Sequence, residues 1–115
     1  MSQSLKRRRG PLSVTISFSR VKFHYTDEAG KSAEDKFAKP GEDIAWKSDD
    51  GAWAVVFEKE DHPFVGSHHV TGKKGKPAVT RIKRRASGTY YYTVIVILPN
   101  GDIFSEDPRL IIRPD

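Results

Sequence analysis

The chain has 115 residues, with 20 Lys and Arg against 15 Asp and Glu, a formal net charge of +5 and no cysteine. A chain of this length forms one domain, and a hydrophobic content of 37% is enough to fill its core without a metal or disulfides. Disulfides, Cys-containing zinc sites, iron–sulfur clusters and blue-copper centres all need cysteine sulfur, so the composition excludes them.

Residues 1–11 are basic and contain no apolar run. Four consecutive cations stand there, namely Lys6, Arg7, Arg8 and Arg9. This composition predicts a flexible basic tail, followed by a single β-sandwich domain over residues 12–115. No stretch approaches the roughly 20 apolar residues that span a membrane, and no apolar region follows the cations as in a signal peptide. We therefore expect no membrane span and a cytoplasmic location.

Short runs in which apolar and polar residues alternate recur between turns, which predicts an all-β chain. Residues 13–18 and 21–25 alternate with opposite parity, so we expect two strands separated by a bulge or a break at Ser19-Arg20. The polar residues 27–35 predict a loop.

The middle of the chain predicts two further strands, residues 43–47 and 52–57, joined by a turn. A long loop with three histidines is expected over residues 62–77, followed by a short strand over 78–82. Residues 89–98 are aromatic or β-branched at nearly every position, which predicts a central strand covered on both faces.

A hairpin turn at Asn100-Gly101 leads to two short strands near the end of the chain, at 103–104 and 110–112. About eight short strands separated by turns predict an antiparallel Greek-key β-sandwich. The expected core residues are Trp46, Trp53, Val55, Phe57, Tyr90, Tyr92 and Val94.

Three segments resemble the cupredoxin fold in their order and spacing. Pro40–Trp46 is a proline-glycine-acid turn that leads into a strand with a tryptophan, Ala52–Phe57 is a valine-rich strand that ends in phenylalanine, and Gly88–Tyr92 is a glycine-x-tyrosine strand. The resemblance covers most of residues 14–98 and includes uncharacterised small bacterial cupredoxin-like proteins. It implies a sandwich of the plastocyanin or azurin type.

The same resemblance implies that the copper ligands are missing. It places the first histidine ligand at Trp53, the cysteine ligand at Val94 and the second histidine ligand at Ile97, and the chain has no methionine beyond Met1. We expect these apolar side chains to fill the former copper pocket as ordinary core. The resemblance therefore implies no cofactor and no electron transfer.

The arrangement of the possible metal-binding and catalytic residues predicts that the chain is not an enzyme. Three histidines of one predicted loop, His62, His68 and His69, contain donors that zinc or copper accepts. Adjacent residues of an extended segment point to opposite sides, however, and no carboxylate stands at a useful spacing, which favours solvated histidines over a metal site. No serine stands on a glycine elbow, and the paired acids lie in predicted turns, where solvated charge is expected.

Charge is segregated along the sequence. Residues 1–26 contain six cations and no acid, 27–61 contain eleven acids and five cations, 62–101 contain seven cations and no acid, and 102–115 have a net charge of −2. The seven cations of the third segment, the basic block, are Lys73, Lys74, Lys76, Arg81, Lys83, Arg84 and Arg85.

Two functions fit this segregation. In the first, a non-enzymatic interaction module associates with itself or with a protein partner through strand edges and through its basic block and an acidic surface at Glu58, Glu60 and Asp61. In the alternative, the basic block and the N-terminal tail bind nucleic acid or another polyanion. We favour association, because the eleven acids of residues 27–61 would repel a polyanion and the tyrosines lie outside the basic block.

Overall fold

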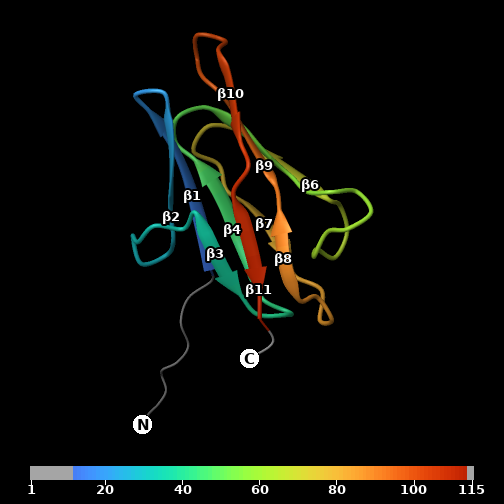
Figure 1. Cartoon of the computed structure of the whole chain (residues 1–115). Helices are drawn as coiled ribbons and strands as arrows, with labels where there is room; N and C mark the ends of the chain where they lie inside the picture. The colour runs from blue at the N-terminus through green and yellow to red at the C-terminus, as the bar shows by residue number, and fades with distance from the viewer. Residues whose placement is uncertain (1–11, 114–115) are drawn as a thin grey trace.

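The computed structural model describes residues 12–113, and over that range the chain forms eleven strands and no helix (Figure 1). The predicted tail of residues 1–11 lies outside the described residues. None of the described residues forms a helix long and apolar enough to cross a membrane. In chain order the strands are β1 (Leu12–Ser19), β2 (Lys22–Thr26), β3 (Asp35–Ala38), β4 (Asp43–Ser48), β5 (Ala52–Val56), β6 (His69–Gly72), β7 (Ala78–Arg81), β8 (Gly88–Tyr91), β9 (Thr93–Ile97), β10 (Ile103–Glu106) and β11 (Arg109–Ile112).

The strands form three sheets, with the orders β2-β1-β4-β7, β10-β9-β5-β6 and β3-β11-β8. Only one residue separates β8 from β9, and two residues separate β10 from β11, so the third sheet continues directly into the second. Together these two sheets face the first sheet. The predicted β-sandwich is confirmed. Two neighbouring pairs, β1 with β4 and β3 with β11, are parallel, whereas the prediction was wholly antiparallel. Parallel neighbours need a crossover connection, which the intervening strands of the other layer provide here.

The expected break between the first two strands is a two-residue hairpin turn. Arg20 and Val21 connect β1 to β2, and their φ angles are 51° and 61°. Positive φ at both central residues is what the right-handed twist of a two-residue hairpin favours. The opposite parity of the two runs is therefore the signature of a turn between paired strands rather than of a bulge.

The core is built around Trp46 of β4. Its ring lies 5.4 Å from that of Tyr92 and 6.5 Å from that of Phe57, while Phe57 and Tyr92 stack at 4.8 Å. Six of the seven expected core residues are buried, and Tyr90 is half-buried against the same cluster. Phe64, which the sequence places in a loop, also belongs to this aromatic core and lies 4.7 Å from Phe57.

The single strand predicted over residues 89–98 is two strands in different sheets. Tyr92 separates β8 from β9, and its backbone N–H donates to the carbonyl of Pro108 at 3.2 Å. β9 is central in its sheet, but within the chain it is covered on one face only, because Val94 and Val96 are buried while Ile97 on the other face is exposed. The predicted long loop of residues 62–77 likewise contains a strand, β6.

A buried ion pair fastens the loop before β3 to the sandwich. The Lys36 side chain is 5% exposed, and its Nζ lies 2.8 Å from Glu28 Oε1. The backbone N–H of Ser13 donates to the same oxygen at 2.9 Å. Burial alone would raise the pKa of Glu28, but hydrogen bonds from Lys36 and Ser13 lower it. One carboxylate therefore joins β1, the loop and β3.

Candidate interaction surface

Two of the three former ligand positions lie inside the sandwich. Trp53 and Val94 are buried on the inner face of β5 and β9. The indole of Trp53 lies over Gly72, where a Cβ atom would collide with the ring, and its Nε1 donates to the carbonyl of Lys76 at 3.3 Å. Trp53 is larger than the histidine that the resemblance implies at this position, and Gly72 on the neighbouring strand leaves room for its ring in the core.

Ile97 corrects the expectation that all three positions fill one pocket. It is 42% exposed and belongs to the outer face of its sheet, opposite Ala52 and Ile103. Side chains alternate along a strand, so Ile97, three residues after Val94, points away from it. In this chain β9 continues as regular strand through this position, and the three side chains do not converge.

The histidines lie near one another without forming a metal centre. The ring of His68 lies 6.2 Å from that of His62 and 4.8 Å from that of His69. His69 Nδ1 hydrogen-bonds the hydroxyl of Ser67 at 3.0 Å, and His62 Nδ1 accepts from the Phe64 N–H at 3.3 Å. Over residues 12–113 no three His, Cys, Asp or Glu side chains are grouped so that they could hold a metal ion.

We predict that the protein does not bind copper tightly. Trp53 and Val94 offer no lone pair at the inner positions, and filling them with apolar groups leaves copper no coordination site. Titration of metal-free protein with Cu(II) and with Cu(I), followed by visible absorption and calorimetry, checks this. An intense charge-transfer band or stoichiometric submicromolar binding would contradict the prediction.

The structure divides the basic block between the two ends of β7. Lys73, Lys74 and Lys76 precede this strand, at the end where the Gly75 N–H donates to Ser48 at the end of β4. At the other end Arg81 lies opposite Asp43, at the start of β4. Because β4 and β7 are antiparallel, the two groups lie at opposite ends of the sheet. The predicted block is therefore not one surface.

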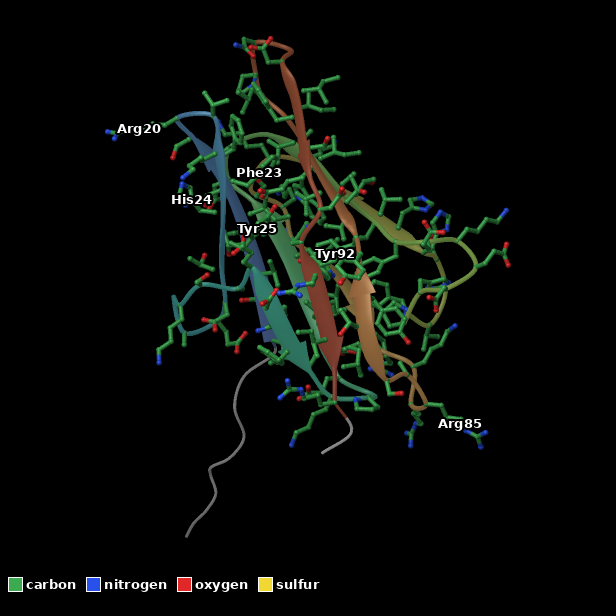
Figure 2. All side chains as sticks on the ribbon, in the orientation of Figure 1. Arg20, Phe23, His24, Tyr25, Arg85 and Tyr92 are labelled. Atoms are coloured by element: carbon green, nitrogen blue, oxygen red, sulfur yellow. The ribbon has the colours of Figure 1, made fainter. Side chains whose placement is uncertain are left out.

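Beyond β7 three exposed cations form what we call the end cluster, which consists of Lys83, Arg84 and Arg85. None of the three makes an ion pair within the described range. Arg81 does not belong to this cluster, because its guanidinium is held by both carboxylate oxygens of Asp43, at 2.8 and 3.3 Å. Figure 2 shows Arg85 pointing outward at one end of the domain and Arg20 at the other.

The predicted acidic surface, Glu58, Glu60 and Asp61, forms a tight turn after β5, in which the Asp61 N–H donates to the Glu58 carbonyl at 3.3 Å. We call these three residues the acid turn. Glu58, Glu60 and Asp61 are exposed, and none of them has an ion-pair partner among residues 12–113. The Lys83 N–H donates to the carbonyl of Pro63, so the end cluster adjoins the segment that follows this acid turn.

His62 lies at the boundary between the two charged groups. Its pKa is lowered by burial first and then by the positive charge of Lys83, while Asp61 acts in the opposite direction. One surface of the domain therefore carries a negative and a positive group side by side.

The acidic surface is larger than the sequence indicates. Glu58 lines a hollow of about 420 Å³ together with Tyr91 and Asp107. A second hollow of about 410 Å³, also lined by Tyr91, contains Glu34, Glu106 and Asp35, of which Asp35 is paired with Arg109 at 2.7 Å. These acids come from distant parts of the chain, so only the folded structure brings them together.

Two buried tyrosine hydroxyls lie near these acids (Figure 2). Tyr25 donates to Glu106 Oε1 at 2.8 Å, and its pKa is raised by burial and then by this hydrogen bond. The hydroxyl of Tyr92 is buried without a hydrogen-bond partner among the described residues, and burial, followed by the charge of Asp35, raises its pKa. Both groups are held in the neutral form, so they add no charge to the acidic surface.

Comparison with known proteins supports the fold. No protein family model matches the chain, and no curated protein matches it. Among solved structures it is similar to a proline-to-glycine mutant of amicyanin in the reduced Cu(I) form at pH 4, with a TM-score of 0.54 and 17% identity over 94% of this chain and 87% of that one. A methionine-to-alanine mutant of amicyanin in the Cu(I) form gives a TM-score of 0.51 and 15% identity with the same coverage of both chains. The chain therefore has a cupredoxin-like fold, and it lacks the copper ligands.

Proposed function

We propose that this copper-free, cupredoxin-like domain is a non-enzymatic interaction module that associates with a second copy or with a protein partner. One observation carries the proposal. The end cluster and the acid turn are exposed, adjoin one another, and consist of charges without ion-pair partners in the described chain. Charges left unpaired within one molecule are available to pair between molecules.

The side-by-side arrangement also favours a symmetric pair. In a two-fold interface each molecule presents the same surface, so a positive group meets the partner's negative group and the reverse contact follows by symmetry. A domain with the two groups adjoining, as here, satisfies both contacts with one surface. An exposed pair of charges contributes little, but several charges that meet together raise the rate and specificity of association.

Charge reversal tests this proposal. Arg84→Glu with Arg85→Glu is expected to lower the low-salt mass of the assembly toward its high-salt value, because like charges then face the acid turn. Arg81 is left intact because it is engaged by Asp43. The matched control is Arg20→Glu with Lys22→Glu, which changes the net charge equally at the hairpin between β1 and β2.

A complementary exchange makes the test specific. Mixing the doubly reversed chain with a chain that carries Glu60→Lys and Asp61→Lys is expected to restore mixed assemblies, since the signs of the two surfaces are exchanged. Light scattering of each chain alone and of the mixture measures this. Pairing between the end cluster and the acid turn would be contradicted if the control variant Arg20→Glu with Lys22→Glu lost as much assembly mass as the test variant. It would also be contradicted if the mixture formed no mixed assemblies.

Polyanion binding is the second candidate, and the placement of Leu12 favours it. Leu12 lies opposite Ile44, at the same end of β4 as Asp43 and Arg81, so the described part of the chain begins at the end-cluster end, and the Lys6 to Arg9 run precedes it in the sequence. Binding through these cations would weaken with salt for every sequence alike, and each lost phosphate contact would lower the salt slope by about one. The neighbouring acid turn opposes such binding, which is why we place it second.

A further inference from the structure

The strand residues on the outer face of the sheet β10-β9-β5-β6 include no acidic residue, lysine or arginine, and Asp107, which accepts a hydrogen bond from the Thr93 hydroxyl at 2.8 Å, borders this face. In register, the outward positions form three rows: Ile103, Ile97 and Ala52; Ser105, Ile95, Ala54 and Thr71; Thr93, Val56 and His69. We call these ten residues the uncharged face. Of the opposite positions of the same strands, Trp53, Val55, Val94 and Val96 are buried in the core. All ten residues are exposed or half-buried within the single chain.

This composition sets the face apart from the rest of the molecule. Charged residues make up 30% of the chain, so about three of ten positions would carry a charge by composition alone. The outer face of β2-β1-β4-β7 carries Asp43, Lys47 and Arg81, and that of β3-β11-β8 carries Asp35 and Arg109. Depletion of charge is the compositional mark of the centre of a protein interface.

The pattern of β9 supports the same interpretation. Its sequence is apolar at inward and outward positions alike, which is typical of a strand covered on both faces. Within the chain the inward Val94 and Val96 are fully buried, whereas the outward Ile95 is only half-buried, and Ile97 and Ile103 remain 42% and 65% exposed. Apolar side chains gathered on one face of a soluble protein mark a surface that another molecule covers.

We propose that the uncharged face is the interface of a face-to-face pair formed by two copies of this chain. The proposal rests on the proposed function, since it takes a second copy as the partner and adds the uncharged face to the charged groups as a surface of that association. Packing of two such sheets buries the isoleucines of both copies without burying any acid, lysine or arginine of the ten positions.

Opposite charges at the two ends of the face indicate that its partner is a second copy of the chain. Glu58 follows β5 at the end of the face marked by Val56. Lys73 and Lys74 follow β6 at the other end, because Gly72 lies opposite Trp53 and His69 opposite Val56. When two copies stack with their strands running in opposite directions, the cationic end of each meets the acidic end of the other. The face is therefore complementary to itself in apolar surface and in charge.

The size of the face sets the expected strength. Four strands about 4.8 Å apart, with about five residues of about 3.3 Å each, give a flat area on the order of 300 Å². A stable interface buries about 800 Å² per partner. The uncharged face supplies the centre of such an interface and the charged ends supply its rim, so we expect a weak pair whose population depends on protein concentration.

Lysine substitutions with a matched control test the proposal. At high salt, where pairing between the end cluster and the acid turn is screened, sedimentation equilibrium of the full chain is expected to show a concentration-dependent pair. Ile97→Lys with Ile103→Lys is expected to weaken that pair at least about tenfold. Val65→Lys with Val79→Lys adds the same charge at exposed valines away from the face, 60% and 62% exposed, and is expected to leave the pair unchanged.

The outcomes separate this proposal from the proposed function. If the face variant pairs as strongly as the parent, or if the parent is a monomer at high salt at every concentration, the uncharged face is not the interface. The proposed function then still stands if Arg84→Glu with Arg85→Glu dissociates the low-salt assembly. Should circular dichroism show that the double lysine variant is unfolded, Ala52→Lys, at an exposed position of the same face, replaces it, with the same expected loss and the same overturning result.

Discussion

Replacing Phe57 with alanine is expected to lower the free energy of unfolding by about 3 to 5 kcal/mol. Phe57 is buried and contacts three aromatic rings, those of Trp46, Phe64 and Tyr92. Its removal leaves a cavity at the centre of the sandwich, and rigid rings cannot collapse into such a space as easily as aliphatic side chains. The loss would be a large part of the 5 to 15 kcal/mol by which a typical domain is stable.

Denaturant unfolding followed by tryptophan fluorescence measures this loss, because Trp46 lies in the same cluster. Phe37→Ala is the control, since Phe37 is an exposed phenylalanine whose ring contacts the guanidinium of Arg113 at 4.6 Å. The control is expected to cost less than about 1 kcal/mol. A Phe57→Ala variant that melts within about 2 °C of the parent would show that the core is placed wrongly.

Replacing Glu28 with glutamine is expected to cost about 2 to 3 kcal/mol, because it leaves the Lys36 ammonium buried without a counter-charge. The value lies at the low end for a broken buried pair, since the Glu28 side chain is 34% exposed and water can reach the site. Lys36→Met is the informative comparison. It removes the buried cation together with its desolvation cost, so we expect it to be much less harmful than Glu28→Gln.

The same pair makes stability depend on pH. The pKa of Glu28 is lower in the folded chain than in the unfolded chain, so the unfolded chain binds more protons in acid. Its contribution is complete above the usual glutamate pKa and is lost as the pH falls through the lowered value. Urea unfolding at neutral and at acidic pH checks this. The stability difference between the parent and Glu28→Gln should shrink in acid, and a difference that grows in acid would contradict the account.

The alternation of apolar residues predicted most strands and most of the core. It placed Trp46, Trp53 and Phe57 correctly, because the two-residue period of a strand states which side chains share a face. It does not state what covers that face. Residues 89–98 therefore looked like one strand buried on both sides, whereas the chain bends at Tyr92 and leaves the outer side of β9 uncovered.

The sequence pattern did not predict contacts between distant segments of the chain. Glu28 belongs to a segment with the composition of a solvated loop, and only the packing of that loop against β1 and against Lys36 of β3 makes the ion pair internal. The basic block is continuous in sequence, but β7 carries its two groups to opposite ends of a sheet. The acidic surface shows the reverse, since Glu58 and Asp107 become neighbours only on folding.

Light scattering of the unmodified chain at about 20 mM and at about 500 mM salt, with and without DNA or RNA, tests the proposed association most directly. We expect a mass above that of the 13.0 kDa chain at low salt in the absence of nucleic acid, and a smaller mass at high salt. A chain that is monomeric at every salt concentration and changes mass only when DNA or RNA is added would contradict it.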